Sequence, residues 1–359
     1  MTASATANRA RDWDLVSGPQ VWLGPDMAAR SDEWIYRISA EDARDLERAT
    51  ATALGSGKDI LNVAATDFPL GAFGEKLSVF REEMLRGRGF KLLRGLPIED
   101  KPVLETAMQF WGIGAHLGHA VSQNAKGHVL GHVKDLGRDY ADPMARGYQT
   151  AARLPYHTDY SDLVGLLCLK TARSGGMSSI VSSAALYNHV MTERPDLGEA
   201  LMQPFYRTRW GEVGGDLPPW IEVPAFNTFK GGVSTSYVRS AVRKAQLMPE
   251  VPRVTDRQEE AMDYFDSLAE SPDFHLDMEL QPGDLQFVNN HFILHSRTAY
   301  VDHADWHEKR HLLRLWLACE DGPTFPPAMT KQFQGLTHNG RPNGIHLPGV
   351  PFSAPLDAE

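Results

Sequence analysis

The sequence predicts an α+β protein in which a mainly β core, a sandwich or barrel, is flanked by helices. Helical patterns fill the first third of the 359 residues, and short strand patterns with turn residues replace them from about residue 120. The strands are irregularly spaced and do not alternate with helices, which disfavours a doubly wound parallel sheet. A sandwich or barrel with external helices is the architecture that fits.

Residues 1–85 are expected to form a helix-rich N-terminal part, with a loop around 18–25. A glycine-led strand follows over 89–96. Apolar residues at helical spacing predict three helices in this third of the chain, over 41–53, 74–85 and 101–117.

Residues 86–320 are expected to hold the β core. Helices are predicted within it over 185–202 and 255–270. Short β-rich segments predict the later strands, over 129–136, 165–172, 178–183, 232–238, 274–280, 284–290, 299–302 and 311–318. The Pro- and Gly-rich stretch 321–359 is expected to be an extended tail, and because no repeat or composition break divides the chain, residues 1–359 are interpreted as one domain.

Composition excludes several classes of protein. The chain has 36 Lys+Arg and 46 Asp+Glu, a net charge of −10, which provides no general attraction to nucleic acid or anionic membranes. It contains neither an apolar secretory leader nor a run of about 18 apolar residues that would span a membrane. The two cysteines, Cys168 and Cys319, lie in apolar runs typical of reduced core thiols. We therefore expect a cytoplasmic protein with a small-molecule partner.

Three motifs carry chemistry. In His157-Thr158-Asp159, residues two apart on an extended segment face the same side, about 6.6 Å apart at their backbones. His295 follows the strand-like 284–290, and two histidines with one carboxylate form the ligand set of non-heme Fe(II) oxygenases and also of some catalytic zinc sites. Ligand type alone leaves both metals open.

The third motif is the predicted strand KRHLLRLWLAC. Alternation puts Arg310, Leu312, Arg314 and Trp316 on one face of this strand. Arginines on an apolar strand are unfavourable unless they pair, and a bound carboxylate would satisfy them. The alternative is an edge strand from which both reach solvent.

These motifs together resemble the taurine dioxygenase (TauD/TfdA) family of Fe(II)/2-oxoglutarate dioxygenases. The similarity rests on HTD, GDLQFVNNHFILHSRT and KRHLLRLWL, with support from GFKLLRGLPI and SGGMSS, and it covers about residues 85–320. It implies a double-stranded β-helix (jelly roll) flanked by helices, and the cofactors Fe(II), 2-oxoglutarate and O₂. Family analogy also suggests a homo-oligomer.

The resemblance assigns roles to individual residues. His157, Asp159 and His295 would be the iron ligands, and Arg310 would bind the distal carboxylate of 2-oxoglutarate. Ser178 stands where members have a Thr that helps hold this carboxylate, although the GGDT-like stretch reads GGMS here. Arg314 would face the keto acid or the substrate. Since halogenating relatives lack the carboxylate ligand, Asp159 favours hydroxylation or a related oxidation such as desaturation, with release of succinate and CO₂.

The prime substrate is expected to be a small organic molecule with an anionic group. Segment 204–243 is Gly- and Pro-rich with aromatic residues, typical of a lid over a pocket, and a packed surface hairpin is the alternative. The candidate substrate contacts are Arg314, Arg239, Tyr237, Trp210, Trp220 and Phe226. Two other functions stay open: a zinc-dependent hydrolase using the same ligands, and a catalytically silent jelly roll.

Overall fold

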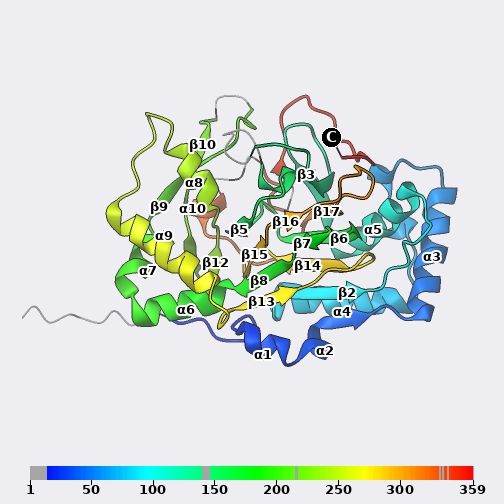
Figure 1. Ribbon diagram of the computed structural model, residues 1–359, viewed down its shortest axis with the longest axis horizontal. Helices are drawn as coiled ribbons and strands as arrows, with labels where there is room; N and C mark the ends of the chain where they lie inside the picture. Colours follow the sequence, from blue (N-terminus) through cyan, green and yellow to red (C-terminus); the bar gives the residue numbers. More distant parts are fainter. Residues whose placement is uncertain are drawn as a thin grey trace, which may run out of the picture.

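Two β-sheets form the centre of the molecule and helices cover their outer faces (Figure 1). The computed structural model describes residues 14–358 except 140–145, 215–216, 331–332, 334 and 338. The described chain also contains short helical turns and a two-stranded ribbon: η1 (Ile60–Asn62), η2 (Ala65–Asp67), η3 (Gly147–Gln149), β7 (Ser174–Gly175) and β16 (Tyr300–Val301).

The larger sheet has eight strands in the order β1-β2-β14-β6-β17-β3-β18, with β4 also beside β17. Its neighbours are antiparallel except at the two ends, where β1 with β2 and β18 with β3 are parallel. The strands are β1 (Ile35–Arg37), β2 (Phe90–Arg94), β3 (His119–Gln123), β4 (Leu130–Lys134), β6 (Leu163–Lys170), β14 (Leu285–Asn289), β17 (His311–Ala318) and β18 (Gly344–Ile345).

The smaller sheet has four antiparallel strands in the order β13-β8-β15-β5. They are β13 (His275–Met278), β8 (Ser178–Ser182), β15 (Ile293–Arg297) and β5 (Leu154–His157). One buried apolar cluster contains Val288 and Trp316 of the larger sheet together with Ile180 and Leu276 of the smaller sheet. The two sheets therefore pack face to face, which confirms the predicted two-sheet core.

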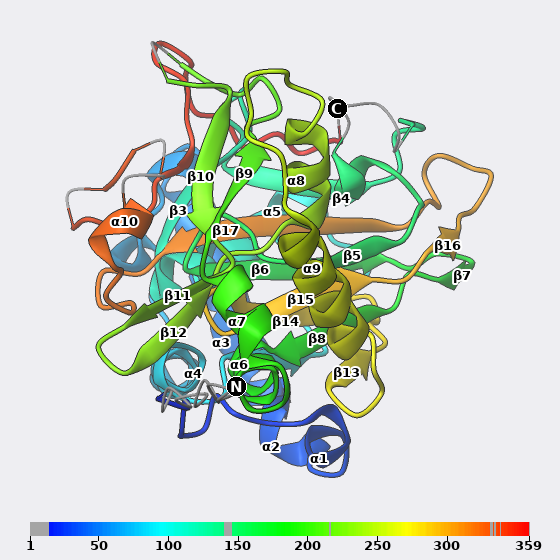
Figure 2. The same ribbon diagram turned by 90° about the vertical axis from the view of Figure 1, so that its left-hand side faces the viewer.

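Helices close both outer faces. A second core cluster joins α3 (Ala40–Gly55), α4 (Ala72–Arg86) and α5 (Val103–Leu117) to the larger sheet, and a third joins α6 (Ser183–Glu193), α7 (Pro195–Leu201) and α9 (Asp256–Ala269) to the smaller sheet. Figure 1 shows α9 and α8 (Arg239–Ala245) at the left and α3 at the right, and α9 and α8 face the viewer in Figure 2. The three predicted N-terminal helices and the strand over 89–96 are confirmed within a few residues.

The helical structure predicted over 185–202 is confirmed, and it consists of two helices. α6 ends at Glu193 and α7 begins at Pro195. Proline has no backbone N–H and cannot continue the preceding helix, but it suits the first position of a new one.

Segment 204–243 is more regular than a loop. It folds into hairpin β9 (Pro204–Thr208) with β10 (Trp220–Pro224), hairpin β11 (Phe226–Phe229) with β12 (Gly232–Thr235), and the start of α8. Short elements also interrupt the N-terminal loop and the C-terminal tail: α1 (Gly24–Ala28), α2 (Ser31–Trp34), α10 (Pro327–Thr330) and β18.

Candidate metal centre and active site

Strand pairing brings the HxD motif and His295 together. β5 and β15 are antiparallel neighbours, and His157 stands directly opposite His295 in their register. The chain leaves β5 after His157, and Asp159 follows two residues later. One ligand atom from each of the three residues lies within 4.8 Å of the other two. The residues thus form a compact N, N, O donor set of the kind that binds Fe(II) or Zn²⁺.

Neighbouring groups orient these three side chains. His157 Nδ1 lies 2.8 Å from the Pro155 carbonyl, so Nδ1 carries the proton and the Nε2 lone pair is available. The Trp316 indole N–H donates to Asp159 Oδ2 at 2.8 Å, and the Asp159 backbone N–H donates to Asn290 Oδ1 at 3.0 Å. Groups behind a metal site commonly hold its ligands in this way.

The protonation states of His157, Asp159 and His295 are those that bind a metal cation. Burial, and next the neighbouring His157, lowers the pKa of His295 to about 3, and burial also lowers the pKa of His157. Burial by itself raises the pKa of Asp159, but Arg314 and the two histidines outweigh it, so this pKa is lowered. Near neutral pH the set is two neutral imidazoles and one carboxylate, the forms that bind a metal.

A cavity runs from the three side chains to Arg310. Its lining includes His157, Asp159 and His295 as well as Ser178 and Arg310. Arg310 is 5% exposed; its Nη2 donates to the Gly176 carbonyl at 3.3 Å, and its Nη1 has no hydrogen-bond partner among the described residues. Ser178 Oγ donates to Gln286 Oε1 at 2.8 Å. An orphaned, buried guanidinium N–H fits a carboxylate ligand.

Arg314 lines this cavity and a second one on the substrate side. Its Nε donates to Gln123 Oε1 at 2.7 Å, and its Nη1 lies 3.6 Å from Asp159 Oδ2. Its guanidinium also lies over the rings of Tyr148 and Trp316. The predicted shared face of Arg310, Arg314 and Trp316 is therefore confirmed, and the edge-strand alternative is wrong because these side chains are buried.

The second cavity contains only part of the predicted substrate contacts. Trp210 lines it beside His157 and Asp159. Arg239 lines it too, but its guanidinium is bound by Asp266 at 2.7 Å, by Glu259 at 2.6 Å and by Asp263. Its charge is thus neutralised by α9, and its role as a substrate contact stays a prediction.

Three other predicted contacts lie away from both cavities. Phe226 is a core residue that packs between Tyr187 and Phe265, and Tyr237 is 3% exposed and donates its hydroxyl to Asp266. Trp220 lines neither cavity and accepts a hydrogen bond from Arg209 at its carbonyl. Aromatic content marked the segment but did not reveal which rings face inward, because that depends on the hairpin register.

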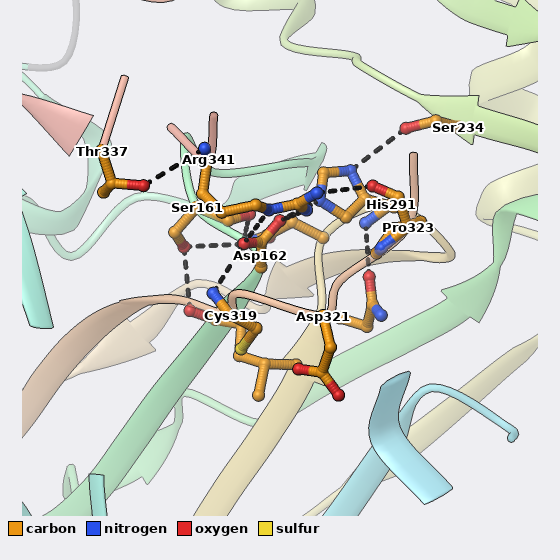
Figure 3. Close-up of polar contacts among 12 residues, drawn as sticks. Ser161, Asp162, Ser234, His291, Cys319, Asp321, Pro323, Thr337 and Arg341 are labelled. Atoms are coloured by element: carbon orange, nitrogen blue, oxygen red, sulfur yellow. Dashed lines mark hydrogen bonds and ion pairs between the residues drawn. The ribbon is translucent and has the colours of Figure 1, made fainter. Parts of the chain in front are cut away.

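Figure 3 shows a buried polar network around Asp162, which follows Asp159 by three residues. Asp162 accepts hydrogen bonds from Arg341 Nε at 2.9 Å and from the Cys319 backbone N–H at 2.8 Å, and its Oδ1 lies 2.8 Å from His291 Nε2. His291 Nδ1 lies 3.1 Å from Ser234 Oγ. Asp162 and His291 lie close in the chain to Asp159 and Asn290, so the network ties the C-terminal tail and β12 to the candidate metal centre. Local sequence patterns contain no signal for it.

Comparison with known proteins agrees with this site. The family model described as "Taurine catabolism dioxygenase TauD, TfdA family" matches residues 55–316. The FR-33289 synthase of Streptomyces rubellomurinus is 31% identical over 91% of this chain and 97% of that protein. The uridine-5'-phosphate dioxygenase of an Amycolatopsis species is 27% identical over 52% of this chain and 71% of its own length.

Solved structures show the same fold. An asparagine oxygenase solved with Fe(II), hydroxyasparagine and succinate has a TM-score of 0.62 at 17% identity, covering 79% of this chain and 93% of that one. The non-heme iron oxygenase OrfP, solved with Fe and alpha-ketoglutaric acid, has a TM-score of 0.57 at 16% identity, covering 79% of this chain and 94% of that one.

The chain belongs to the TauD/TfdA family of dioxygenases and is an oxidoreductase with a jelly-roll core. This confirms the family and fold predicted from the motifs. The zinc hydrolase alternative finds no support, since these relatives and structures are oxygenases or a synthase of the same family. In the described part of the chain, no helix has the length and apolar character needed to cross a membrane.

Proposed function

We propose that this enzyme uses Fe(II) and 2-oxoglutarate to hydroxylate a small anionic organic molecule, with His157, Asp159 and His295 as the iron ligands. The donor set and the lowered histidine pKa values support the metal assignment. Fe(II) with 2-oxoglutarate and O₂ supplies the oxidising power that converts a C–H bond to C–OH, while the keto acid becomes succinate and CO₂.

The observation that carries this proposal is the unpartnered Nη1 of buried Arg310 in the same cavity as the three candidate ligands. Arg310 would bind the distal carboxylate of 2-oxoglutarate, with the Ser178 hydroxyl beside it. Val164, Leu166 and Leu312 line the rest of this cavity and would keep water out. Arg314, between the two cavities, would orient the keto acid or the substrate.

The anionic character of the substrate is supported by cationic side chains around the second cavity. Arg146, Lys244 and Arg314 line it. The relatives point the same way, since one is named for uridine-5'-phosphate and the family for taurine, which are both acids.

The test is an anaerobic titration of the protein with Fe(II) and then 2-oxoglutarate, followed by visible absorption. Chelation of Fe(II) by the keto acid produces a weak charge-transfer band, which should be absent in His295→Ala. In Arg310→Gln the half-saturating 2-oxoglutarate concentration should rise at least about 30-fold, because truncating one partner of a buried charge pair costs about 2–5 kcal/mol. Arg48→Gln, an exposed arginine on α3, is the control. Failure of the wild type to form the band would refute the proposal.

The cellular setting stays part of the proposal. The two cysteines are buried free thiols, as suits a reducing cytoplasmic compartment. The net charge of −10 supports small-molecule rather than nucleic-acid partners. Family resemblance supports a homo-oligomer, which size-exclusion chromatography with light scattering would test.

A further inference from the structure

Strand β9 and the residue after it carry two buried arginines that the chemistry above does not use. Arg207 is 2% exposed and Arg209 is 8% exposed. Arg207 lies on β9 and Arg209 follows two residues later, so an extended chain directs both side chains to the same side. Among the described residues, no carboxylate pairs with either guanidinium.

The polar partners of these arginines are few. Arg207 Nη2 donates to Ser236 Oγ at 3.1 Å, while its Nε and Nη1 have no partner among the described residues. Arg209 Nε donates to the Trp220 carbonyl at 3.2 Å. An unpaired buried charge costs several kcal/mol, and folded proteins rarely keep one without a use. Two neighbouring buried guanidinium groups without a carboxylate partner indicate a site for an anion.

Tyr160 connects this pair to the metal centre. The Arg207 guanidinium carbon lies 5.4 Å from the centre of the Tyr160 ring. Tyr160 directly follows Asp159 and lines the second cavity with it, and with Arg209, Arg146 and Trp210 it also lines a small adjoining cavity. Arg209 therefore borders the substrate side of the active site, and Arg207 lies behind Tyr160 without lining either cavity; neither arginine lines the cavity that contains Arg310.

Three other arginines of this region each have a carboxylate nearby. Arg146 forms an ion pair with Glu212, Arg239 is bound by three carboxylates of α9, and Arg314 lies 3.6 Å from Asp159. Arg207 and Arg209 differ from these three arginines, because neither has a carboxylate partner among the described residues. A phosphoryl group carries a charge of about −1.5 to −2 at neutral pH, whereas a carboxylate or sulfonate carries one negative charge, and guanidinium groups match phosphoryl oxygens in pairs.

We propose that Arg207 and Arg209 bind the phosphoryl dianion of the prime substrate, which is a phosphate monoester or a phosphonate. Tyr160 and Trp210 flank the rest of the molecule, and its reacting carbon lies toward His157, Asp159 and His295. This inference rests on the proposed function, because it identifies the substrate class of that active site.

The experiment uses full-length enzyme loaded anaerobically with Fe(II) and 2-oxoglutarate. The probes are propyl phosphate, propylphosphonate and propanesulfonate, which share a carbon chain and differ in head group. Each is titrated at pH 8 while the unfolding temperature is recorded. We expect at least one phosphoryl probe to raise the unfolding temperature saturably, with a half-saturating concentration at least about tenfold below that of propanesulfonate. Tighter binding of propyl phosphate would indicate a phosphate monoester as the substrate, and tighter binding of propylphosphonate would indicate a phosphonate.

Variants connect this binding to β9. Arg207→Gln and Arg209→Gln should each weaken binding of the phosphoryl probe at least about tenfold. Arg207→Lys keeps the charge but lacks the forked N–H donors of the guanidinium, and it should weaken binding less. Arg243→Gln, an exposed arginine on α8, is the matched control and should bind like the wild type. If Arg207→Gln does not fold, Arg209→Gln and Arg207→Lys provide the same comparison.

The outcomes separate this inference from the function on which it rests. The charge-transfer band is recorded in every sample before the probe is added. If the band forms but the phosphoryl and sulfonate probes bind with equal affinity, the phosphoryl site is overturned and the proposed function stands. The same holds if the band forms and phosphoryl binding is undiminished in the Arg207 and Arg209 variants. A wild type without the band overturns both.

Discussion

At the scale of single residues, Trp316 and Asn290 hold Asp159 in the candidate metal centre, Trp316 at its carboxylate and Asn290 at its backbone. The indole N–H donates to Asp159 Oδ2, and the Asn290 side-chain carbonyl accepts the Asp159 backbone N–H. Trp316 lies on β17 and Asn290 directly follows β14, and these are two different strands of the larger sheet. Asp159 is thus oriented from two directions, although it lies in a loop.

The Trp316 contact predicts a specific metal-binding defect. Trp316→Phe keeps an aromatic ring but removes the donor to Asp159, and loss of such an outer contact typically weakens metal affinity about 10- to 100-fold. Anaerobic titration calorimetry with Fe(II) measures this change. Trp306→Phe, at an exposed tryptophan, is the control. An unchanged Fe(II) affinity in Trp316→Phe would show that the indole N–H does not orient the ligand.

At the scale of elements, the helical layer on the larger sheet depends on close packing of α5. A Cβ atom on Gly112 of α5 would lie 2.4 Å from ring carbons of Phe68, which is fully buried. The space is too small for a methyl group unless the ring moves. A Cβ atom on Gly55, at the end of α3, would instead meet no other atom within 4 Å.

This difference predicts opposite effects of the same substitution. Gly112→Ala should destabilise the protein by about 1–3 kcal/mol, because overpacking forces side chains from their preferred positions. Gly55→Ala should stabilise it by about 0.4–1 kcal/mol through the lower entropy of the unfolded chain. Urea unfolding of both variants checks the pair. Similar free energies of unfolding for Gly112→Ala and Gly55→Ala would mean that the Phe68 ring moves to make room for the added methyl group.

At the scale of the whole molecule, the C-terminal tail closes back onto the β core near the active site. β18 pairs with β3, Arg341 binds Asp162, and His132 Nε2 donates to the Pro355 carbonyl at 2.9 Å. His132 Nδ1 in turn lies 2.7 Å from His311 Nε2, so two imidazoles fasten the tail to β4 and β17. At least one of the two rings must be neutral for this chain of hydrogen bonds, because two protonated imidazoles would both donate and would repel each other.

These histidines predict an acid-sensitive contribution to stability. Burial is the main cause that lowers the pKa of both, for His311 to about 3, while the unfolded value is about 6.5. The unfolded chain therefore binds the protons first, so the contribution is complete above about pH 6.5 and is lost as pH falls toward 3. Between pH 7.5 and 5, wild type should lose about 1–2 kcal/mol more stability than His311→Gln.

Urea midpoints at the two pH values measure this loss. His307→Gln, in the exposed loop before β17, is the matched control and should follow the wild type. If His311→Gln were as acid-sensitive as the wild type, the imidazole pair would not be the group responsible.

The sequence by itself determined the features that depend on local periodicity and on ligand chemistry. Strand alternation set Arg310, Arg314 and Trp316 on one buried face, and the donor types of His157, Asp159 and His295 indicated a metal centre before the fold was known. The N-terminal helices were predictable for the same reason, because their apolar spacing is local. The roles of the three candidate ligands remain predictions until metal binding is measured.

Only the tertiary structure decided which charged groups are balanced and which are left for a ligand. Arg239 and Arg207 look alike in the sequence, but one is held by three carboxylates of α9 and the other has no acidic partner among the described residues. Asp162 and Arg341 meet across 179 positions of the chain. Such pairings depend on how strands and helices pack, and electrostatic balance is a property of space and not of sequence neighbourhood.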